Sequence, residues 1–216
     1  VRSLTNGKIP IVWGGTHASI LPEQTLKSEY ADIVCIGEGE ITFLELIEAL
    51  QLNIPLKSIQ GIAFKNGSEI VIAPERPLLD VEALLPVPWE LVDVNSYIHP
   101  DFYLKKSNRT LDIGQTSRGC PFLCGFCSSA SIRQRKWRAM SVERSLQTII
   151  EPVKKFNLNG IWIRDDEFYI DKKRTQMICE GIIKAGLKIC WYTSGTRVDV
   201  FNKSSDEQIA LLKRSG

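Results

Sequence analysis

Two short apolar runs stand out in the first fifty residues, and each one ends in glycine. Residues 9–13 (IPIVW) lead into Gly14-Gly15, and residues 31–40 (ADIVCIGEGE) lead into Gly37 and Gly39. Continuous apolar runs of this length are typical of buried parallel strands that end in tight turns. We therefore predict two strands of one sheet here.

Each of these strands is followed by a stretch with helical signals. Pro22 suits the first position of a helix within residues 21–30. Residues 41–50 carry apolar side chains at three- and four-residue spacing, which predicts a helix that lays this face on the sheet: Phe43, Leu44, Ile47 and Leu50. The order strand, helix, strand, helix indicates the end of an open α/β domain.

Residues 51–108 lose this alternation. Residues 61–73 (GIAFKNGSEIVIA) predict a β-hairpin with a type I′ turn at Asn66-Gly67, because this pair accepts the two positive φ angles that the turn requires. The two prolines of LLPVPWELV then interrupt regular structure. We interpret the whole segment as a connector that contains a hairpin.

The α/β alternation returns after the connector. Strands are predicted in residues 111–119, 160–168 and 187–200, with amphipathic stretches between them. Three βα units in this space match part of a βα barrel, which places its active residues at the C-terminal ends of the strands.

The helices between these strands have recognisable ends. Ser141 and Asp171 suit N-caps, Gly186 suits a C-terminal cap, and Ser204 with Glu207 predicts a capping box for the last helix. The helix after Ser141 should bury one stripe: Val142, Leu146, Ile149, Ile150, Val153 and Phe156.

Composition narrows the classes of partner. The 216 residues are 44% hydrophobic, and 27 Lys+Arg are mixed with 25 Asp+Glu, so we expect no nucleic acid or membrane partner. The basic run at 132–138 is interpreted as a solvated helix face or a substrate-side loop. No apolar run is long enough to span a bilayer and the first residues have no signal-peptide pattern, which favours a cytoplasmic location. The chain lacks an initial Met, so we expect a fragment of a longer protein.

Three of the six cysteines crowd into one stretch. Cys120, Cys124 and Cys127 have the spacing C-x3-C-x2-C, and their number suits a metal site better than a disulfide scaffold. A structural zinc site completed by another cysteine or a histidine is one alternative, although no second C-x2-C is present. A four-iron cluster held by three thiolates would instead leave one iron open to a ligand.

The stretch TSRGCPFLCGFCS, with Phe126 directly before the third cysteine, resembles the radical S-adenosylmethionine (SAM) superfamily. The resemblance implies a [4Fe-4S] cluster on Cys120, Cys124 and Cys127, whose open iron binds SAM. It also implies an electron donor such as flavodoxin or ferredoxin and a small-molecule substrate. The catalytic residues beyond this set stay unknown.

The resemblance implies SAM contacts in two further strand ends. Asp165, Asp166 and Glu167 are candidates to hold the amino group of SAM, because a carboxylate suits an ammonium. Arg197 is the candidate for its carboxylate. Ordinary helix caps for the acids, and an ion pair with Asp199 for the arginine, are the structural alternatives.

The first fifty residues resemble the second half of the cobalamin-binding domain found in one radical SAM class. That class includes corrinoid-dependent methyltransferases and the anaerobic magnesium-protoporphyrin monomethyl ester cyclase. The resemblance implies cobalamin contacts at Gly14, Gly15, Thr16 and Gly37. His17 stands in a different motif from that of the cobalt-ligating histidine of the family, so we interpret it as a turn or packing residue.

The expected fold is therefore α/β: the C-terminal part of an open Rossmann-like cobalamin-binding domain (1–50), a connector (51–108) and the N-terminal half of a TIM-like radical SAM barrel (109–216). The expected function is reductive SAM cleavage and C–H activation for cobalamin-dependent methyl transfer or oxidative cyclisation. A methylthiotransferase-like enzyme without cobalamin and a non-enzymatic zinc-binding module are the alternatives.

Overall fold

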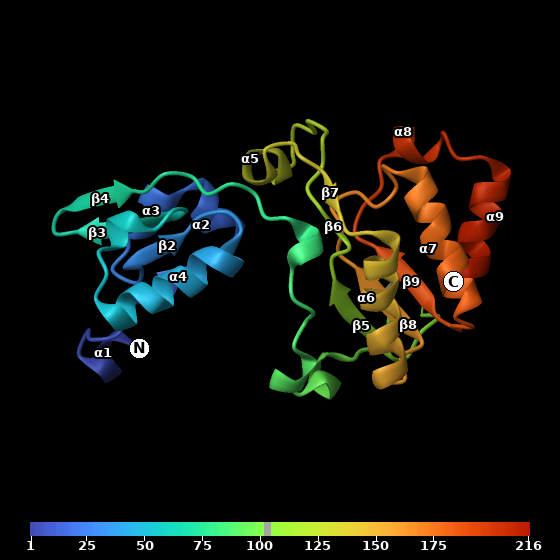
Figure 1. Ribbon diagram of the computed structural model, residues 1–216, viewed down its shortest axis with the longest axis horizontal. Coiled ribbons are helices and arrows are strands. Elements are labelled where there is room, and N and C mark those ends of the chain that lie inside the picture. Colours follow the sequence, from blue (N-terminus) through green and yellow to red (C-terminus); the bar gives the residue numbers. More distant parts are fainter. Residues whose placement is uncertain (102–104) are drawn as a thin grey trace. The chain divides into compact units, whose positions relative to one another are not determined.

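The computed structural model describes residues 1–101 and 105–216 and contains two compact units (Figure 1). The first unit consists of Val1–Leu79 together with Leu123–Gln134, and the second of Asp80–Phe122 together with Arg135–Gly216. Both units combine parallel strands with helices, so the protein has an α/β fold. No helix within the described residues is long and apolar enough to cross a membrane.

The first unit is built on a four-stranded sheet with the order β1-β2-β3-β4. Strands β1 (Val12–Trp13) and β2 (Ile33–Cys35) are parallel, whereas β3 (Ile62–Asn66) and β4 (Glu69–Ile72) form a hairpin that pairs antiparallel with β2. The predicted hairpin therefore extends the first sheet. Its two-residue loop is Gly67-Ser68, and only Gly67 has a positive φ, so the type I′ turn predicted at Asn66-Gly67 is wrong.

Helices cover both faces of this sheet. Successive strand residues point to opposite sides, so each face has apolar side chains to bury against a helix. Ile33, Ile62 and Phe64 pack with α4 (Gly39–Leu52), which runs along one face. Val34 and Ala63 pack on the other face with α2 (Thr16–Ile20) and α3 (Pro22–Lys27). The unit also contains the short helices α1 (Arg2–Thr5), η1 (Leu56–Ser58) and α5 (Ser129–Arg133).

The face of α4 that we predicted to be buried is wrong for three of its four residues, and only Leu50 packs, partly buried, against the core. Its buried residues are Thr42, Leu46 and Ala49, whereas Phe43, Leu44 and Ile47 are exposed. Apolar residues occur all around this helix, so their spacing alone did not single out one stripe.

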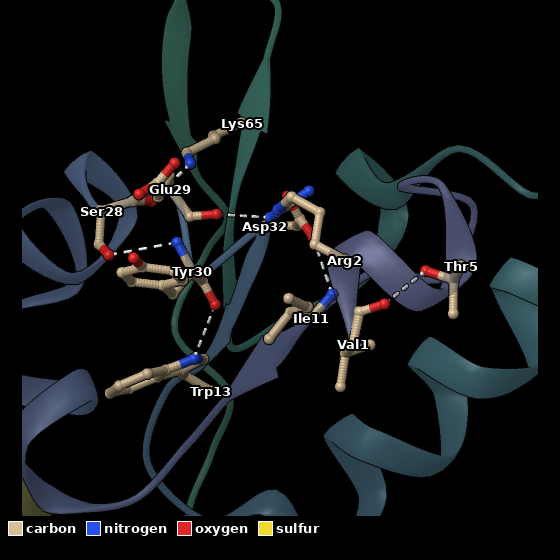
Figure 2. Close-up of polar contacts among 10 residues, drawn as sticks. All are labelled: Val1, Arg2, Thr5, Ile11, Trp13, Ser28, Glu29, Tyr30, Asp32 and Lys65. Carbon is tan, nitrogen blue, oxygen red and sulfur yellow. Dashed lines mark hydrogen bonds and ion pairs between the residues drawn. The ribbon is translucent and has the colours of Figure 1, made fainter.

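A polar cluster ties the N-terminal turn to the start of β2. The Arg2 guanidinium pairs with Asp32 at 2.9 Å, and the backbone N–H of Ile11 donates to the other oxygen of Asp32 at 2.8 Å (Figure 2). Burial alone would raise the pKa of Asp32, but these two partners hold it below its usual value.

The second unit contains a parallel three-stranded sheet with the order β5-β8-β9. Its strands are β5 (Thr110–Gly114), β8 (Gly160–Ile163) and β9 (Cys190–Thr193). The predicted first strand is in fact two, because Gly114 has a φ of 83° and the chain resumes as β6 (Ser117–Arg118), which pairs with β7 (Arg138–Ala139). Short 3-10 helices precede the sheet: η2 (Val81–Ala83), η3 (Trp89–Leu91) and η4 (Val94–Tyr97).

Long helices cover one face of this sheet. They are α6 (Val142–Lys155), α7 (Lys172–Lys184) and α9 (Asp206–Ser215), with the short α8 (Val198–Phe201) before the last. Their apolar stripes enclose a core of strand and helix side chains: Leu111, Ile113, Ile149, Ile161, Ile163, Ile178 and Ile182. The predicted Ser141 and Asp171 caps are confirmed, but the last capping box uses Ser205 and Gln208, one residue later than predicted.

Candidate functional site

The cysteine loop lies between β6 and α5. Gly119 enters it with a φ of 86°, and the N–H of Cys127 donates to the carbonyl of Cys124 at 3.0 Å, which closes a turn around Phe126. Cys120 and Cys124 are partly buried and Cys127 is exposed. The Phe126 side chain is 93% exposed.

The three thiols suit an iron–sulfur cluster by their chemistry. None of them forms a disulfide, and they come from eight consecutive residues. The boundary between the two units falls at Phe122–Leu123, inside this loop. Within the described residues, no group of three or more potential ligands is already gathered around a metal position.

The other cysteines belong to the hydrophobic interior or to strands. Cys35 and Cys179 are buried, and burial raises the pKa of both thiols. Cys190 begins β9 and is partly buried. None of the three joins a gathered set of metal ligands within the described residues.

Asp165 follows β8 and is completely buried. One carboxylate oxygen accepts the backbone N–H groups of Thr116 and Ser117 at 2.6 and 3.0 Å. The other accepts the hydroxyls of the same two residues at 2.8 and 2.6 Å. The carboxylate therefore fixes the segment that leads from β5 into the cysteine loop.

The next two acids also bind backbone N–H groups. Asp166 accepts the N–H of Gly119 at 2.8 Å, directly before Cys120. Glu167 is buried and accepts the N–H of Arg197 at 2.8 Å and that of Tyr169 at 3.2 Å. Three consecutive acids thus hold the loop after β5 on one side and the loop after β9 on the other. Their predicted contact with the amino group of SAM stays a prediction.

Arg197 lies against the cysteine loop. Its guanidinium carbon is 4.2 Å from the centre of the Phe122 ring, which is a cation–π geometry. The same guanidinium binds Asp199 through two hydrogen bonds of 2.9 Å, and this partner holds the pKa of Asp199 below its usual value. The ion pair considered from the sequence is therefore present, beside the loop that carries the cysteines.

Arg174 is a structural residue of this site that we did not predict. It donates to the carbonyls of Met140 and Thr116 at 3.0 and 2.9 Å, and to the hydroxyl of Ser145 at 2.7 Å. Burial lowers its pKa. A signal was available, because Arg174 occupies the same helical stripe as Ile178 and Ile182, four and eight residues later.

The predicted cobalamin residues lie at two turns of the first unit. Gly14 and Gly15 join β1 to α2, where Thr16 is the first helical residue, and Gly37 follows β2. The N–H of Gly37 donates to Ser19 of α2 at 2.9 Å, which brings the two turns together.

Open space borders Gly15 and Gly37, and a side chain at Gly14 would make only ordinary contact with Cys35. A Cβ at Gly14 would come no closer than 3.8 Å to another atom of the protein, and one at Gly15 or Gly37 would meet nothing within 4 Å. Gly15 and Gly37 need glycine for their positive φ, but packing does not demand it at Gly14. The turns therefore leave room for a ligand to approach the backbone closely.

Residues 115–216 match the family model of the radical SAM superfamily. This part of the chain is a radical SAM domain. The resemblance seen in the cysteine motif is thereby confirmed. The match begins between β5 and β6 and contains the cysteine loop, the three acids and Arg197.

Curated relatives extend the likeness to the first unit. The chain is 34% identical over 213 residues to an uncharacterised methyltransferase of Pyrococcus horikoshii, which covers 98% of this chain and 44% of that protein. It is 28% identical to the anaerobic magnesium-protoporphyrin IX monomethyl ester cyclase of Cereibacter sphaeroides, over 95% of this chain and 33% of the relative. The chain thus spans less than half the length of either relative.

Solved structures of cobalamin-dependent radical SAM enzymes share the fold. OxsB with aqua-cobalamin bound gives a TM-score of 0.68 at 26% identity, over 99% of this chain and 30% of that one. TsrM from Kitasatospora setae, with cobalamin and a [4Fe-4S] cluster bound, gives a TM-score of 0.64 at 16% identity. That match covers 100% of this chain and 42% of TsrM. The fold around the radical SAM domain is therefore that of cobalamin-dependent radical SAM enzymes.

Proposed function

We propose that the full-length protein is a radical SAM enzyme whose [4Fe-4S] cluster is held by Cys120, Cys124 and Cys127. The observation that carries this proposal is the C-x3-C-x2-C loop, free of disulfides, within a matched radical SAM domain. A cluster with three protein ligands leaves one iron open for SAM. When bound, the cluster supplies the electron that splits SAM into methionine and a 5′-deoxyadenosyl radical.

The residues around the loop would position these groups. Asp165 and Asp166 hold the backbone from Thr116 to Gly119, so they set where Cys120 begins. Arg197 is the proposed partner of the SAM carboxylate, because it lies beside Phe122 and carries a planar guanidinium that suits a carboxylate. Of the three acids, Asp166 is the proposed partner of the amino group, because it is exposed, whereas Asp165 and Glu167 are buried and their carboxylate oxygens already accept hydrogen bonds.

In this proposal the architecture is a partial βα barrel (109–216) preceded by the end of a Rossmann-like cobalamin-binding domain (1–50). The connector between them (51–108) contains the hairpin that extends the first sheet. Consecutive parallel strands β5, β8 and β9 lie next to one another and are followed by helices, which is the winding of a βα barrel. The parallel pair β1-β2, with helices on both faces, supports the Rossmann-like part.

The proposed cofactor of the first unit is cobalamin, bound at the turns of Gly14, Gly15, Thr16 and Gly37. The space beside these turns and the cobalamin-dependent relatives support it. The proposed reaction is methyl transfer to, or oxidative cyclisation of, a small molecule, because the relatives are methyltransferases and cyclases. An electron donor such as flavodoxin or ferredoxin completes the proposal.

Anaerobic reconstitution of the full-length protein tests the cluster. We expect about four irons per chain with sulfide, and 5′-deoxyadenosine after addition of dithionite and SAM. Cys124→Ala should abolish both, whereas Cys190→Ala, the matched control outside the loop, should retain both. One tightly held zinc without iron would refute the proposal.

Cobalamin binding needs a separate measurement. Hydroxocobalamin should bind the reconstituted protein with a changed corrinoid absorbance spectrum, and Gly14→Val should weaken this binding because its side chain would fill the space beside the turn. Iron binding without any corrinoid binding would favour a cobalamin-independent enzyme of the methylthiotransferase type.

A further inference from the structure

A buried ion pair connects the turn after β2 with the helix after the cysteines. Glu38 directly follows Gly37, and its side chain is 3% exposed. One carboxylate oxygen accepts the N–H of Leu79 at 2.9 Å, and the other pairs with Nη1 of Arg133 at 2.7 Å. All of these residues belong to the first unit.

Arg133 is the last residue of α5, six positions after Cys127. Its side chain is 22% exposed, so it is shielded from water along most of its length. The next residue, Gln134, donates from its side-chain amide to Glu75. Two successive residues thus anchor the C-terminal end of the segment 123–134, which carries Cys124 and Cys127.

The ion pair borders a pocket in the first unit. The pocket has a volume of about 50 Å³ and is lined in part by Ser19, Gly37, Glu38, Arg76, Ser131 and Ile132. The turn that contains Gly37 therefore forms one wall of the pocket, and α5 forms another. A shift of α5 would change this wall and the path of the chain from Cys127 at the same time.

The burial of the pair makes it specific for one arrangement. An exposed ion pair contributes little and tolerates rearrangement, whereas removal of one partner of a buried pair leaves an uncompensated charge in a poorly hydrated site. The second oxygen of Glu38 accepts the backbone N–H of Leu79, which fixes the position of the Glu38 carboxylate. The ion pair therefore forms only when Arg133 lies at that position.

We propose that Glu38 and Arg133 are a positioning pair that holds the segment of Cys124 and Cys127 against the turn proposed to contact cobalamin. This inference rests on the proposed function, since the turn and the segment are assigned their cofactors there. It gives a role to one arginine of the basic run 132–138, which sequence alone assigned to a solvated face or a substrate-side loop.

The first test uses the full-length protein without cofactors. Arg133→Gln should raise the rate at which iodoacetamide alkylates Cys124 by about tenfold, because the segment opens more often when its anchor is lost. Arg133→Lys keeps the charge and should stay close to the wild type. Arg2→Gln breaks the more exposed Arg2–Asp32 pair of the same unit and should leave the Cys124 rate unchanged. Equal Cys124 rates in Arg133→Gln and the wild type would overturn the inference.

The second test uses the reconstituted protein well below its unfolding temperature. Arg133→Gln should release iron to a chelator about tenfold faster than the wild type, and Arg2→Gln should not. Bound hydroxocobalamin should slow iron release in the wild type and lose this effect in Arg133→Gln, which a purely stabilising pair would not produce. Unchanged iron release and an unchanged cobalamin effect in Arg133→Gln would overturn the positioning role.

The two tests separate this inference from the proposed function. If the wild type holds no iron, the proposed function fails, and the alkylation of Cys124 still decides whether Arg133 anchors the segment. If iron binds but the Arg133 variants behave like the wild type in both tests, the inference fails and the proposed function stands.

Discussion

The hydroxyl of Ser117 donates a hydrogen bond of 2.6 Å to the carboxylate of Asp165, while the Ser117 backbone N–H donates to the other oxygen of that carboxylate. Thr116 repeats the same two bonds, so four donors converge on one buried acid. The end of β8 and the entry to the cysteine loop are thereby joined through a single side chain.

Asp165→Asn should destabilise the protein by about 2–4 kcal/mol, because an amide offers an N–H group where the site presents only donors. Urea unfolding of the cofactor-free protein measures this loss. Asp112→Asn is the control, since Asp112 pairs with Arg164 at a site where both side chains are about half exposed, and should cost less than about 1 kcal/mol. Equal losses in the two variants would contradict the role of Asp165.

Arg197 binds the carboxylate of Asp199 in the structure and is proposed to bind the carboxylate of SAM. Arg197→Gln should weaken SAM binding by about tenfold, because it removes a charge-assisted hydrogen bond. Asp199→Asn should leave SAM binding equal or tighter, because it removes a competing carboxylate. The perturbation of the reduced cluster's EPR spectrum by SAM measures both. Loss of SAM binding in Asp199→Asn would instead mean that the Arg197–Asp199 pair itself is required.

The six cysteines should differ in their reactivity. In the cofactor-free folded protein at pH 8, iodoacetamide should modify the exposed Cys127 first and should modify Cys35 and Cys179 only after unfolding. Both buried thiols are also less ionised than usual, because burial raises their pKa. Peptide mass spectrometry gives the order. Modification of Cys179 at the rate of Cys127 would show that the core around α7 is open.

Stability should fall in alkaline solution. Burial raises the pKa of Cys179 above its usual 9.0 and that of Tyr169 to about 12. The folded state therefore keeps these protons longer than the unfolded state. The Cys179 contribution is complete below pH 9 and is lost as the pH rises through its folded-state pKa, and that of Tyr169 is lost between pH 10 and about 12.

Urea unfolding under reducing conditions at pH 7.5 to 10.5 measures this decline. Cys179→Ala should be less stable than the wild type at pH 7.5 but should lose less of its remaining stability as the pH rises. Parallel declines in the two proteins would show that Cys179 does not contribute.

The order of elements followed from local signals in the sequence. Pro22 at the first position of α3, the Ser141 and Asp171 caps, and Gly186 with its positive φ after α7 are all where the sequence placed them. Such signals act within one helical turn, so they need no knowledge of the tertiary structure. The face of α4 was missed because it depends on which neighbour the helix meets.

In the candidate site, too, some features could be predicted from the sequence and others could not. The residue types and their places at strand ends were predictable, because parallel strands present their C-terminal ends at one edge of a sheet. The partners were not. The backbone donors of Asp165, the Phe122 ring under Arg197 and the Leu79 N–H at Glu38 are 41 to 75 positions away along the chain, and only folding brings them near.

The run of acids after β8 also limits how this protein can change. The carboxylates of residues 165 and 166 accept hydrogen bonds from residues 116–119, and that of residue 167 accepts one from Arg197, so deleting one of the three acids would misalign the anchors of two loops together. Loops at this edge of the sheet can therefore be exchanged with those of relatives only as a matched set. Attempts to alter substrate choice by grafting one loop alone should fail in folding before they fail in chemistry.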